Sequence, residues 1–143
     1  NFGAEKYDRI RKAMKYSFKL SIIIGIVVAT IIFILSYKIY LIFNNNILII
    51  EYTRLYLMII PISFGVLGLS VIVSSMFTGL QKPMNSAEIF AIKVFLLTIP
   101  LAYLGSYLIG LNGIFIGICL GNFLIGTYSY FRIKKYLKYN LNA

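Results

Sequence analysis

Residues 20–37 read LSIIIGIVVATIIFILSY, an uncharged run bounded by Lys19 and Lys38. An α-helix rises about 1.5 Å per residue and the hydrocarbon core of a bilayer is about 30 Å thick, so about 20 apolar residues make one crossing. The run therefore predicts a transmembrane helix. Buried β-strands can also be rich in Ile and Val, but they usually end after about 4–8 residues.

Two longer uncharged runs follow, at 55–81 and 94–131. The second is too long for one helix, and it has a natural break at GLNG, residues 110–113, because Gly and Asn suit a tight turn. We therefore predict an all-α integral membrane protein. Its four transmembrane helices are expected at about 17–43, 54–81, 87–109 and 112–133, after a cytoplasmic amphipathic loop or helix at 1–16 and before a basic cytoplasmic tail at 134–143.

The composition agrees with this class of protein. Hydrophobic residues make up 60% of the 143 residues, and only 13% are charged, about half the share of a soluble domain. There is no His and one Cys, Cys119, so the chain cannot build a common zinc site or a catalytic triad. We expect no enzyme activity, no metal and no cofactor. Nucleic acid is not an expected partner either, because the basic residues interrupt apolar runs instead of covering a soluble surface.

The distribution of Lys and Arg predicts the orientation in the membrane, because cytoplasmic loops carry an excess of both. Most of the 14 basic residues precede the first predicted helix, lie around the second connection or follow the fourth helix. The opposite side holds only Lys38 and Arg54. We expect a multi-pass protein of the cell membrane with both ends of this chain in the cytoplasm.

Small residues recur at four-residue spacing in three of the predicted helices. Such residues share one stripe of a helix and allow a neighbouring backbone to approach closely. The predicted packing positions are Ser21, Gly25 and Ala29 in the first helix, Ala102, Ser106 and Gly110 in the third, and Gly113, Gly117 and Gly121 in the fourth.

Polar residues within the predicted helices are candidates for lining a substrate cavity. Ser63, Ser70, Ser74 and Thr78 follow one face of the second helix at steps of seven, four and four. This stripe faces either other helices or a wet cavity, and the pattern does not choose between them. Asn122 is the remaining polar residue of the fourth helix, and we expect it to hydrogen-bond a neighbouring helix.

Lys93 and Pro100 distinguish the third helix. Lys93 lies about one turn inside the membrane, where its ammonium either reaches the interface or faces a cavity. Pro100 cannot donate a backbone hydrogen bond, so it predicts a kink. Glu51 and Glu88 lie at the ends of helices. A transporter coupled to protons or sodium usually needs a carboxylate deeper in the membrane, so its ion site would lie outside this chain.

Several segments resemble the multidrug and toxic compound extrusion (MATE) family. The opening NFGAEKYDRIRKAMKYS resembles the loop after the second helix of a half, and IEYTRLYLMIIPISFGVLGLS resembles the next helix but one. The segment IPLAYLGSYLIGLNGIFIGICLGNFL resembles the last two helices. SSMFTGLQKPM resembles the family's F-Q-G-x-G-K segment, from which Thr78 and Gln81 depart.

The resemblance implies helices nine to twelve of a twelve-helix transporter, within the C-terminal six-helix half, and the start at Asn1 inside a motif implies a longer protein. Its partners would be the N-terminal half, helices seven and eight, and membrane lipid. The implied activity is alternating-access export of drugs or small organic cations, coupled to Na⁺ or H⁺. The expected cavity residues are then Ser70, Ser74, Thr78, Lys93 and Asn122, with Pro100 as a bending point.

Two alternatives remain open from the sequence. A lipid-linked oligosaccharide flippase of the same superfamily would bind a pyrophosphate-linked glycan, and we would expect it to carry more basic residues within the membrane than Lys93 alone. A small membrane subunit without transport activity would use the same four helices only for assembly.

Overall fold

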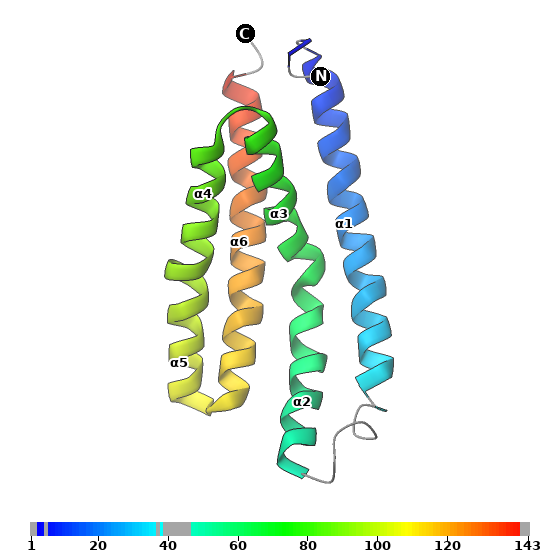
Figure 1. The fold of residues 1–143 in the computed structure, drawn as a ribbon, viewed down its shortest axis with the longest axis vertical. Helices are drawn as coiled ribbons and strands as arrows, with labels where there is room; N and C mark the ends of the chain where they lie inside the picture. Colours follow the sequence, from blue (N-terminus) through cyan, green and yellow to red (C-terminus); the bar gives the residue numbers. More distant parts are fainter. Residues whose placement is uncertain (1–2, 5, 37, 39–46, 141–143) are drawn as a thin grey trace.

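The computed structural model describes residues 3–4, 6–36, 38 and 47–140, and its elements are helices. They form four rods that run antiparallel to their neighbours in sequence (Figure 1). Each rod is long and apolar enough to cross a bilayer, which confirms an all-α membrane fold with four spans. In chain order the elements are α1 (Tyr7–Ser36), α2 (Ile47–Ile59), the 3-10 segment η2 (Ile60–Ser63), α3 (Phe64–Gly79), α4 (Pro83–Ala91), the π-helical segment η3 (Ile92–Thr98), α5 (Ile99–Ile109) and α6 (Leu111–Asn140). The first rod is α1, the second runs from α2 through η2 to α3, the third from α4 through η3 to α5, and the fourth is α6.

Tight turns separate the second, third and fourth rods. After α3, Gln81 takes a positive φ of 58°, and Pro83 begins α4, where its fixed φ suits the first helical turn. Between α5 and α6 the turn is Gly110, with a φ of 64° that favours glycine. The predicted break at 110–113 is thus shorter than expected, because α6 already begins at Leu111.

The first and last rods have different bounds from those predicted. α1 begins at Tyr7, so the amphipathic segment predicted at 1–16 and the span predicted at 17–43 share one helix that is described to Ser36. The predicted end at 39–43 lies outside the described residues. α6 continues to Asn140 and includes most of the tail predicted at 134–143. A charged residue limits a membrane crossing, but Lys and Arg have good helix propensity and do not end the helix.

The second rod begins at Ile47, earlier than the predicted 54. Glu51 and Arg54 therefore lie within α2, where both are exposed, and not before the helix. The sequence analysis also missed an interruption. Pro61 lies in the 3-10 segment η2, which separates α2 from α3 within the rod. Proline removes one backbone donor and its ring crowds the preceding turn, so a tighter local helix at this position has a clear cause.

The third rod begins at Pro83, earlier than the predicted 87, and it contains a wider irregularity than a simple proline kink. The backbone is π-helical over Ile92–Thr98, and the Ile99 N–H bonds to the Val94 carbonyl five residues earlier. Pro100 follows at once. A proline ring clashes with the carbonyl four residues before it, and a π-helical turn is one way to accommodate that clash. The predicted irregularity therefore lies mainly before Pro100.

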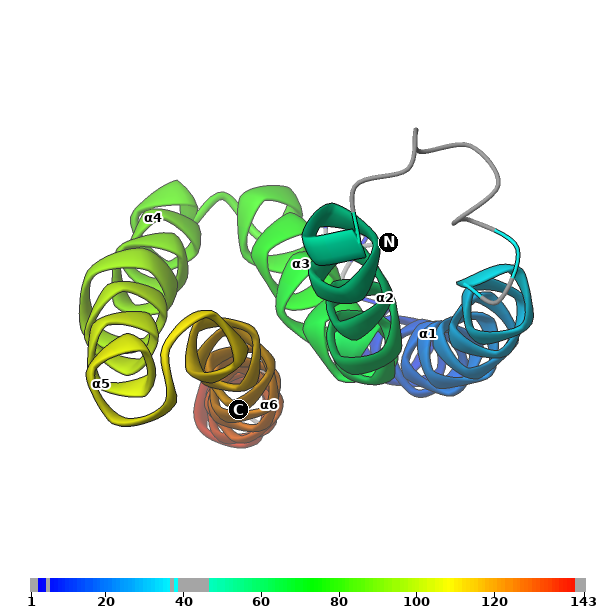
Figure 2. The same cartoon turned by 90° about the horizontal axis from the view of Figure 1, so that it is seen from below.

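The rods pack as one curved layer with α3 and α6 at its centre. Seen along the rods, α6 lies between α5 and α3, and α1 lies on the other flank of α3 (Figure 2). The main core joins α1, α3 and α6 and includes Met14, Phe18, Val73, Phe77 and Ile133.

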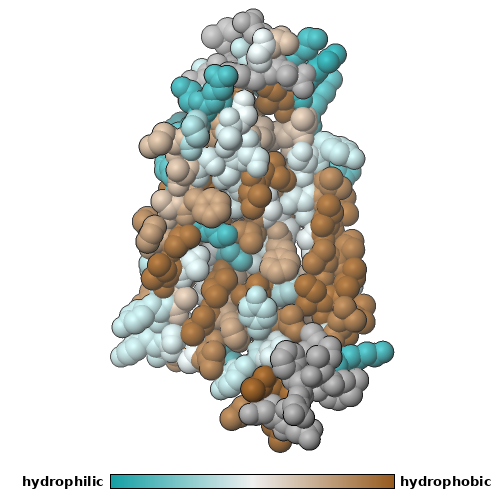
Figure 3. Space-filling view, viewed as in Figure 1, coloured by the Kyte–Doolittle hydropathy of each residue, from teal (hydrophilic) through white to brown (hydrophobic). Residues whose placement is uncertain are grey.

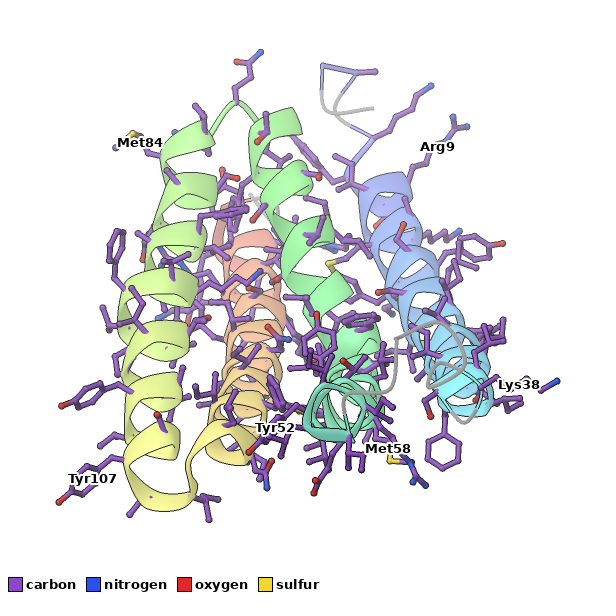
Figure 4. All side chains as sticks on the ribbon, turned by 60° about the horizontal axis from the view of Figure 1, so that its bottom comes forward. Arg9, Lys38, Tyr52, Met58, Met84 and Tyr107 are labelled. Atoms are coloured by element: carbon purple, nitrogen blue, oxygen red, sulfur yellow. The ribbon has the colours of Figure 1, made fainter. Side chains whose placement is uncertain are left out.

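Most of the apolar surface is not buried within these four rods. None of the described residues of α5 is fully buried, and Tyr107 is 82% exposed and points outward (Figure 4). Brown, hydrophobic side chains cover the middle of the face drawn in Figure 3, while hydrophilic ones gather mainly at the upper end. Lipid or further helices must cover such a surface, since water would not.

Glycines set the closest approaches between rods. A Cβ at Gly25 would lie closer than 3.0 Å to the backbone of Gly65, and one at Gly117 would collide with Leu101. Gly113 and Gly105 meet in the same way between α6 and α5. Gly25, Gly113 and Gly117 of the predicted packing stripes thus lie at close contacts between helices.

Two other predicted packing residues make looser contacts. A Cβ at Gly121 would meet Leu97 at 3.7 Å, which is ordinary van der Waals contact. Ala29 is half-buried and lines a small pocket together with Pro61 and Met58 of the second rod.

Candidate functional site

A buried polar interface joins α3 and α6. The Asn122 side-chain amide donates a 2.8 Å hydrogen bond to Ser63 Oγ, and the Ser63 hydroxyl donates to the Ile60 carbonyl at 2.8 Å. Ser63 is fully buried and Asn122 is 4% exposed. The expectation that Asn122 bonds a neighbouring helix is confirmed. Its partner Ser63 stands at the end of the 3-10 segment η2, so the interruption and the polar contact occur at the same level of the rod.

The same interface contains the predicted serine stripe. α3 and α6 run parallel, and their register is fixed by Ser63–Asn122 at one end and by the edge-to-face rings of Phe77 and Tyr136 at the other. Ser70 lies on the stripe of α3 that begins at Ser63, seven residues away and therefore two turns further along. In both pairs the α6 residue follows its α3 partner by 59 positions in the sequence. The same separation puts Ser129 of α6 at the level of Ser70.

Two hydroxyls of this interface have no partner among the described residues. Ser70 Oγ donates to the Leu67 carbonyl of its own helix at 2.7 Å. Ser74 Oγ and Ser129 Oγ are buried without a hydrogen-bond partner among the described residues. A buried hydroxyl left unpaired costs about 1–3 kcal/mol, so two of them in one interface mark a place where apolar residues would pack better. The structure therefore assigns Ser70 and Ser74 to a helix interface within these four rods.

The other predicted cavity residues lie apart from this interface. Thr78 is exposed and bonds to the Ser74 carbonyl at 3.1 Å. The Lys93 ammonium lies 5.7 Å from the centre of the Phe90 ring, one turn nearer to the start of α4. This is the direction in which a lysine reaches toward the interface, as one of the two sequence interpretations requires. Both Lys93 and Pro100 lie on the third rod. Lys93 is the second residue of η3, and Pro100 lies two residues after the end of η3.

One ionic cluster was missed by the sequence analysis. Glu88 of α4 forms a salt bridge to Arg132 of α6, with Oε2 and Nη2 2.6 Å apart. Tyr128 donates its hydroxyl to the other Glu88 oxygen at 3.2 Å. A signal was present, since the predicted topology puts Glu88 and Arg132 at the same side of the membrane with opposite charges. The cluster ties α4 to α6 where neither glycine contacts nor the serine stripe do.

Replacing Asn122 by leucine should lower the free energy of unfolding by about 1 kcal/mol, the usual value of a hydrogen bond between membrane helices. The Ser63 hydroxyl would keep its bond to the Ile60 carbonyl, so only the contact between helices is lost. Denaturant titration of the purified full-length protein in detergent measures the change. Thr127→Val is the matched control, because Thr127 is exposed on α6 and bonds only to Phe123 of its own helix. Equal stability of both variants would show that the Asn122 bond contributes nothing.

The fold and the site together define a class of protein. Four crossing helices expose a wide apolar surface, and their buried polar residues are serines and an asparagine rather than a set of catalytic groups. Among the described residues, no three or more His, Cys, Asp or Glu side chains are grouped as metal ligands. The chain is part of a multi-pass membrane protein.

Comparison with known proteins gives the family. The family model described as MatE matches residues 1–104, which is most of the chain. The chain therefore belongs to the MatE family of membrane transporters, as its resemblance to that family predicted.

Individual relatives agree with the family. A protein of Shewanella oneidensis named "FAD transporter" is 26% identical over 135 residues, covering 94% of this chain and 30% of that protein. A crystal structure of a mutant of the Vibrio cholerae MATE transporter VcmN matches with a TM-score of 0.92 and 25% identity, over 98% of this chain and 32% of that one. VcmN in its bent form matches with a TM-score of 0.90 and 24% identity, over 96% and 31%. The chain thus spans about a third of the length of these relatives.

Proposed function

We propose that this chain supplies helices nine to twelve of a cation-coupled antiporter that exports drugs or small organic cations. The observation that carries the proposal is the match of nearly the whole chain to a MATE transporter with a TM-score of 0.92, together with the MatE family model. The large exposed apolar surface fits a part of a larger bundle, whose remaining helices would be the N-terminal half and helices seven and eight.

The proposed location is the cell membrane, with both ends of this chain in the cytoplasm. The start of α1, the turn before α4 and the end of α6 lie at one end of the layer (Figure 1). Lys82 and Lys134 belong to that end, with most of the basic residues of α1. Arg9 and Lys38 point away from opposite ends of α1 (Figure 4). The excess of Lys and Arg at one end supports this orientation by the positive-inside rule.

In this proposal the hydroxyl-rich interface of α3 and α6 forms part of the cavity wall, with Thr78, Lys93 and Asn122 as further candidates. The buried hydroxyls support it, because Ser74 has no partner among the described residues and Ser70 bonds only within its own helix, so both could bond to a substrate that reaches them. Transporters open such sites by rocking one group of helices against another. The 3-10 segment η2 and the π-helical segment η3 before Pro100 are the bending points of the two rods they interrupt.

Coupling to Na⁺ or H⁺ in this proposal uses an acidic residue outside the chain. Of the four carboxylates, Glu88 is paired with Arg132 near the end of its rod, and Asp8 lies in the first turn of α1. A carboxylate that binds a transported ion lies deeper in the membrane. The coupling site would therefore lie in helices that this chain does not contain.

A second candidate substrate is a flavin nucleotide. It is favoured by the similarity to the protein of Shewanella oneidensis that is named "FAD transporter". FAD carries a pyrophosphate, so a cavity that binds it needs positive groups, whereas an organic cation needs acceptors or aromatic faces. Uptake assays in vesicles that contain the full-length transporter, with ethidium and FAD as separate substrates, distinguish the two candidates.

The double variant Ser70→Ala with Ser74→Ala should lower the rate of ethidium transport by the full-length protein roughly tenfold, about 1 kcal/mol or slightly less for each hydroxyl. Its folding should be preserved, because Ser70 bonds only within its helix and Ser74 has no partner among the described residues. Ser75→Ala is the control, since Ser75 is exposed on the same helix and bonds to Val71. Unchanged transport by the double variant at normal protein levels would refute the assignment of Ser70 and Ser74 to the cavity wall.

A further inference from the structure

A groove with a volume of about 520 Å³ lies between α1 and α6, near the start of α1 and the end of α6. Figure 2 shows α1 and α6 on either side of α3, and residues of α1 and α6 line the groove. No acidic side chain is among the described residues that line it, and half of its lining residues are basic. The four basic residues are Arg11, Lys15, Lys134 and Lys138.

Helical spacing brings these four cations together. Arg11 and Lys15 are four residues apart on α1, so they lie on one face, one turn from each other. Lys134 and Lys138 have the same spacing on α6. Arg11 also joins the helices, because its Nη2 donates to the Leu137 carbonyl of α6 at 3.3 Å. The two cationic pairs therefore face one groove although more than a hundred residues separate them in the sequence.

Within the described part of the chain, the acidic residue paired with this cluster is Asp8. Asp8 lies 3.9 Å from Arg11, but its side chain is 92% exposed to solvent, so the pair is weak. Lys134 lies over the Tyr130 ring, with Nζ 5.8 Å from the ring centre, which orients the ammonium without neutralising it. The described lining residues therefore give the groove a net positive charge.

The floor of the groove is apolar. Met14 and Phe18 are each 8% exposed, and Leu137 is 3% exposed. The rings of Phe18 and Tyr130 are in contact, with their centres 5.6 Å apart. Phe18 and Tyr130 also lie nearer to the long uncharged runs at 20–37 and 94–131 than the groove cations of their own helices do.

We propose that this groove binds an anionic phospholipid. The lipid phosphate lies among the four cations, and an acyl chain follows the apolar floor past Phe18 toward the middle of the bilayer. A basic pocket between transmembrane helices at the cytoplasmic side is suited to an anionic headgroup. A free phosphate would use the cations but not the floor, and an organic cation would be repelled. The binding does not depend on which substrate is transported.

Binding of single lipids to the purified full-length transporter tests the proposal. Native mass spectrometry and thermal unfolding are measured with phosphatidylglycerol, phosphatidylcholine and inorganic phosphate added to the detergent solution. Phosphatidylglycerol should bind and raise the unfolding temperature, because a ligand of the folded state stabilises it. Phosphatidylcholine and inorganic phosphate should each give a much smaller effect. Equal effects of phosphatidylglycerol and either of the others would overturn the proposal.

Charge removal inside and outside the groove locates the site. The triple variant Lys15→Gln, Lys134→Gln, Lys138→Gln should bind phosphatidylglycerol roughly 100-fold more weakly, at about fivefold for each lysine. The control variant Lys6→Gln, Lys12→Gln, Lys19→Gln removes the same charge from residues outside the groove and should bind almost normally. Equal loss in both variants would show unspecific attraction and refute the site.

Smaller changes keep the test decisive if the triple variant does not fold. Lys138 is exposed, so Lys138→Gln alone should fold and should bind phosphatidylglycerol about fivefold more weakly. Lys135→Gln, on the same turn, should fold and keep its affinity for phosphatidylglycerol. The charge-conserving variant Lys15→Arg, Lys134→Arg, Lys138→Arg should retain binding. Loss of binding in that variant, or equal binding by Lys138→Gln and Lys135→Gln, would contradict a phosphate site formed by these cations.

Discussion

Replacing Gly113 by alanine should lower the free energy of unfolding by about 2–3 kcal/mol and remove most of the folded protein from the membrane. A Cβ at Gly113 would overlap the Gly105 carbonyl, and a Cβ at Gly105 would overlap the Gly113 carbonyl. The obstructing atoms belong to the backbone, so α5 and α6 must separate instead of moving one side chain. Overpacking of this kind typically costs about 1–3 kcal/mol, and membrane helices depend on close packing because lipid is as apolar as their side chains.

Gly121→Ala is the matched control on the same stripe of α6. A Cβ there would meet Leu97 at an ordinary 3.7 Å, so no helix has to move. Alanine also favours helix over glycine by about 1 kcal/mol, so this variant should be as stable as the parent protein or more stable. Protein level and denaturant titration in detergent measure both variants. Similar destabilisation by the two substitutions would mean that the contact between α5 and α6 relaxes easily and that glycine at 113 is not required for it.

These two glycines show how far sequence reasoning extends in this chain. The spacing of Gly113, Gly117 and Gly121 predicts one packing stripe, and two of the three make the close contacts it implies. The partner Gly105 could not be chosen in advance. Spacing identifies a face of one helix, but the level at which two helices cross depends on packing along their whole length.

The number of rods was predictable because charged residues in a membrane are costly, so Lys and Arg collect near the ends of crossings. Element bounds were less predictable for the same reason. Arg54 and Arg132 limit the apolar runs, yet both lie inside helices that continue beyond them. The 3-10 segment η2 was missed although Pro61 was visible, because proline can also begin a helix or bend it, and the backbone response depends on its neighbours.

The polar site was predicted in part. The four-residue steps of the second helix predict a face that holds Ser70 and Ser74, and both are buried against α6. Thr78 belongs to the same steps but is exposed. Ser129 could not be added from the sequence, because a single serine on α6 gives no periodic signal. Its relation to Ser70 appears only once the parallel register of α3 and α6 is known.

Replacing Arg132 by glutamate should destabilise the protein by about 2 kcal/mol and lower its amount in the membrane several-fold. The salt bridge from Arg132 to Glu88 is 2.6 Å long, and both side chains are more than a third exposed, at 38% and 42%. A pair at such exposure contributes at most about 1 kcal/mol, and reversal replaces that attraction by a repulsion of similar size. Tyr128 would continue to donate to Glu88, so the second carboxylate would be left unpaired beside it.

The exchange Glu88→Arg with Arg132→Glu restores opposite charges across the same contact and should recover most of the lost stability. Lys135→Glu is the control for net charge, because it makes the same change near the same end of α6 without touching Glu88. Protein level and unfolding in detergent, measured in high and low salt, compare the three variants. If the exchanged pair is as unstable as Arg132→Glu alone, the cluster does not hold α4 against α6 through its charges. Recovery with the exchange, and little loss with Lys135→Glu, would instead show that this ionic contact holds α4 against α6.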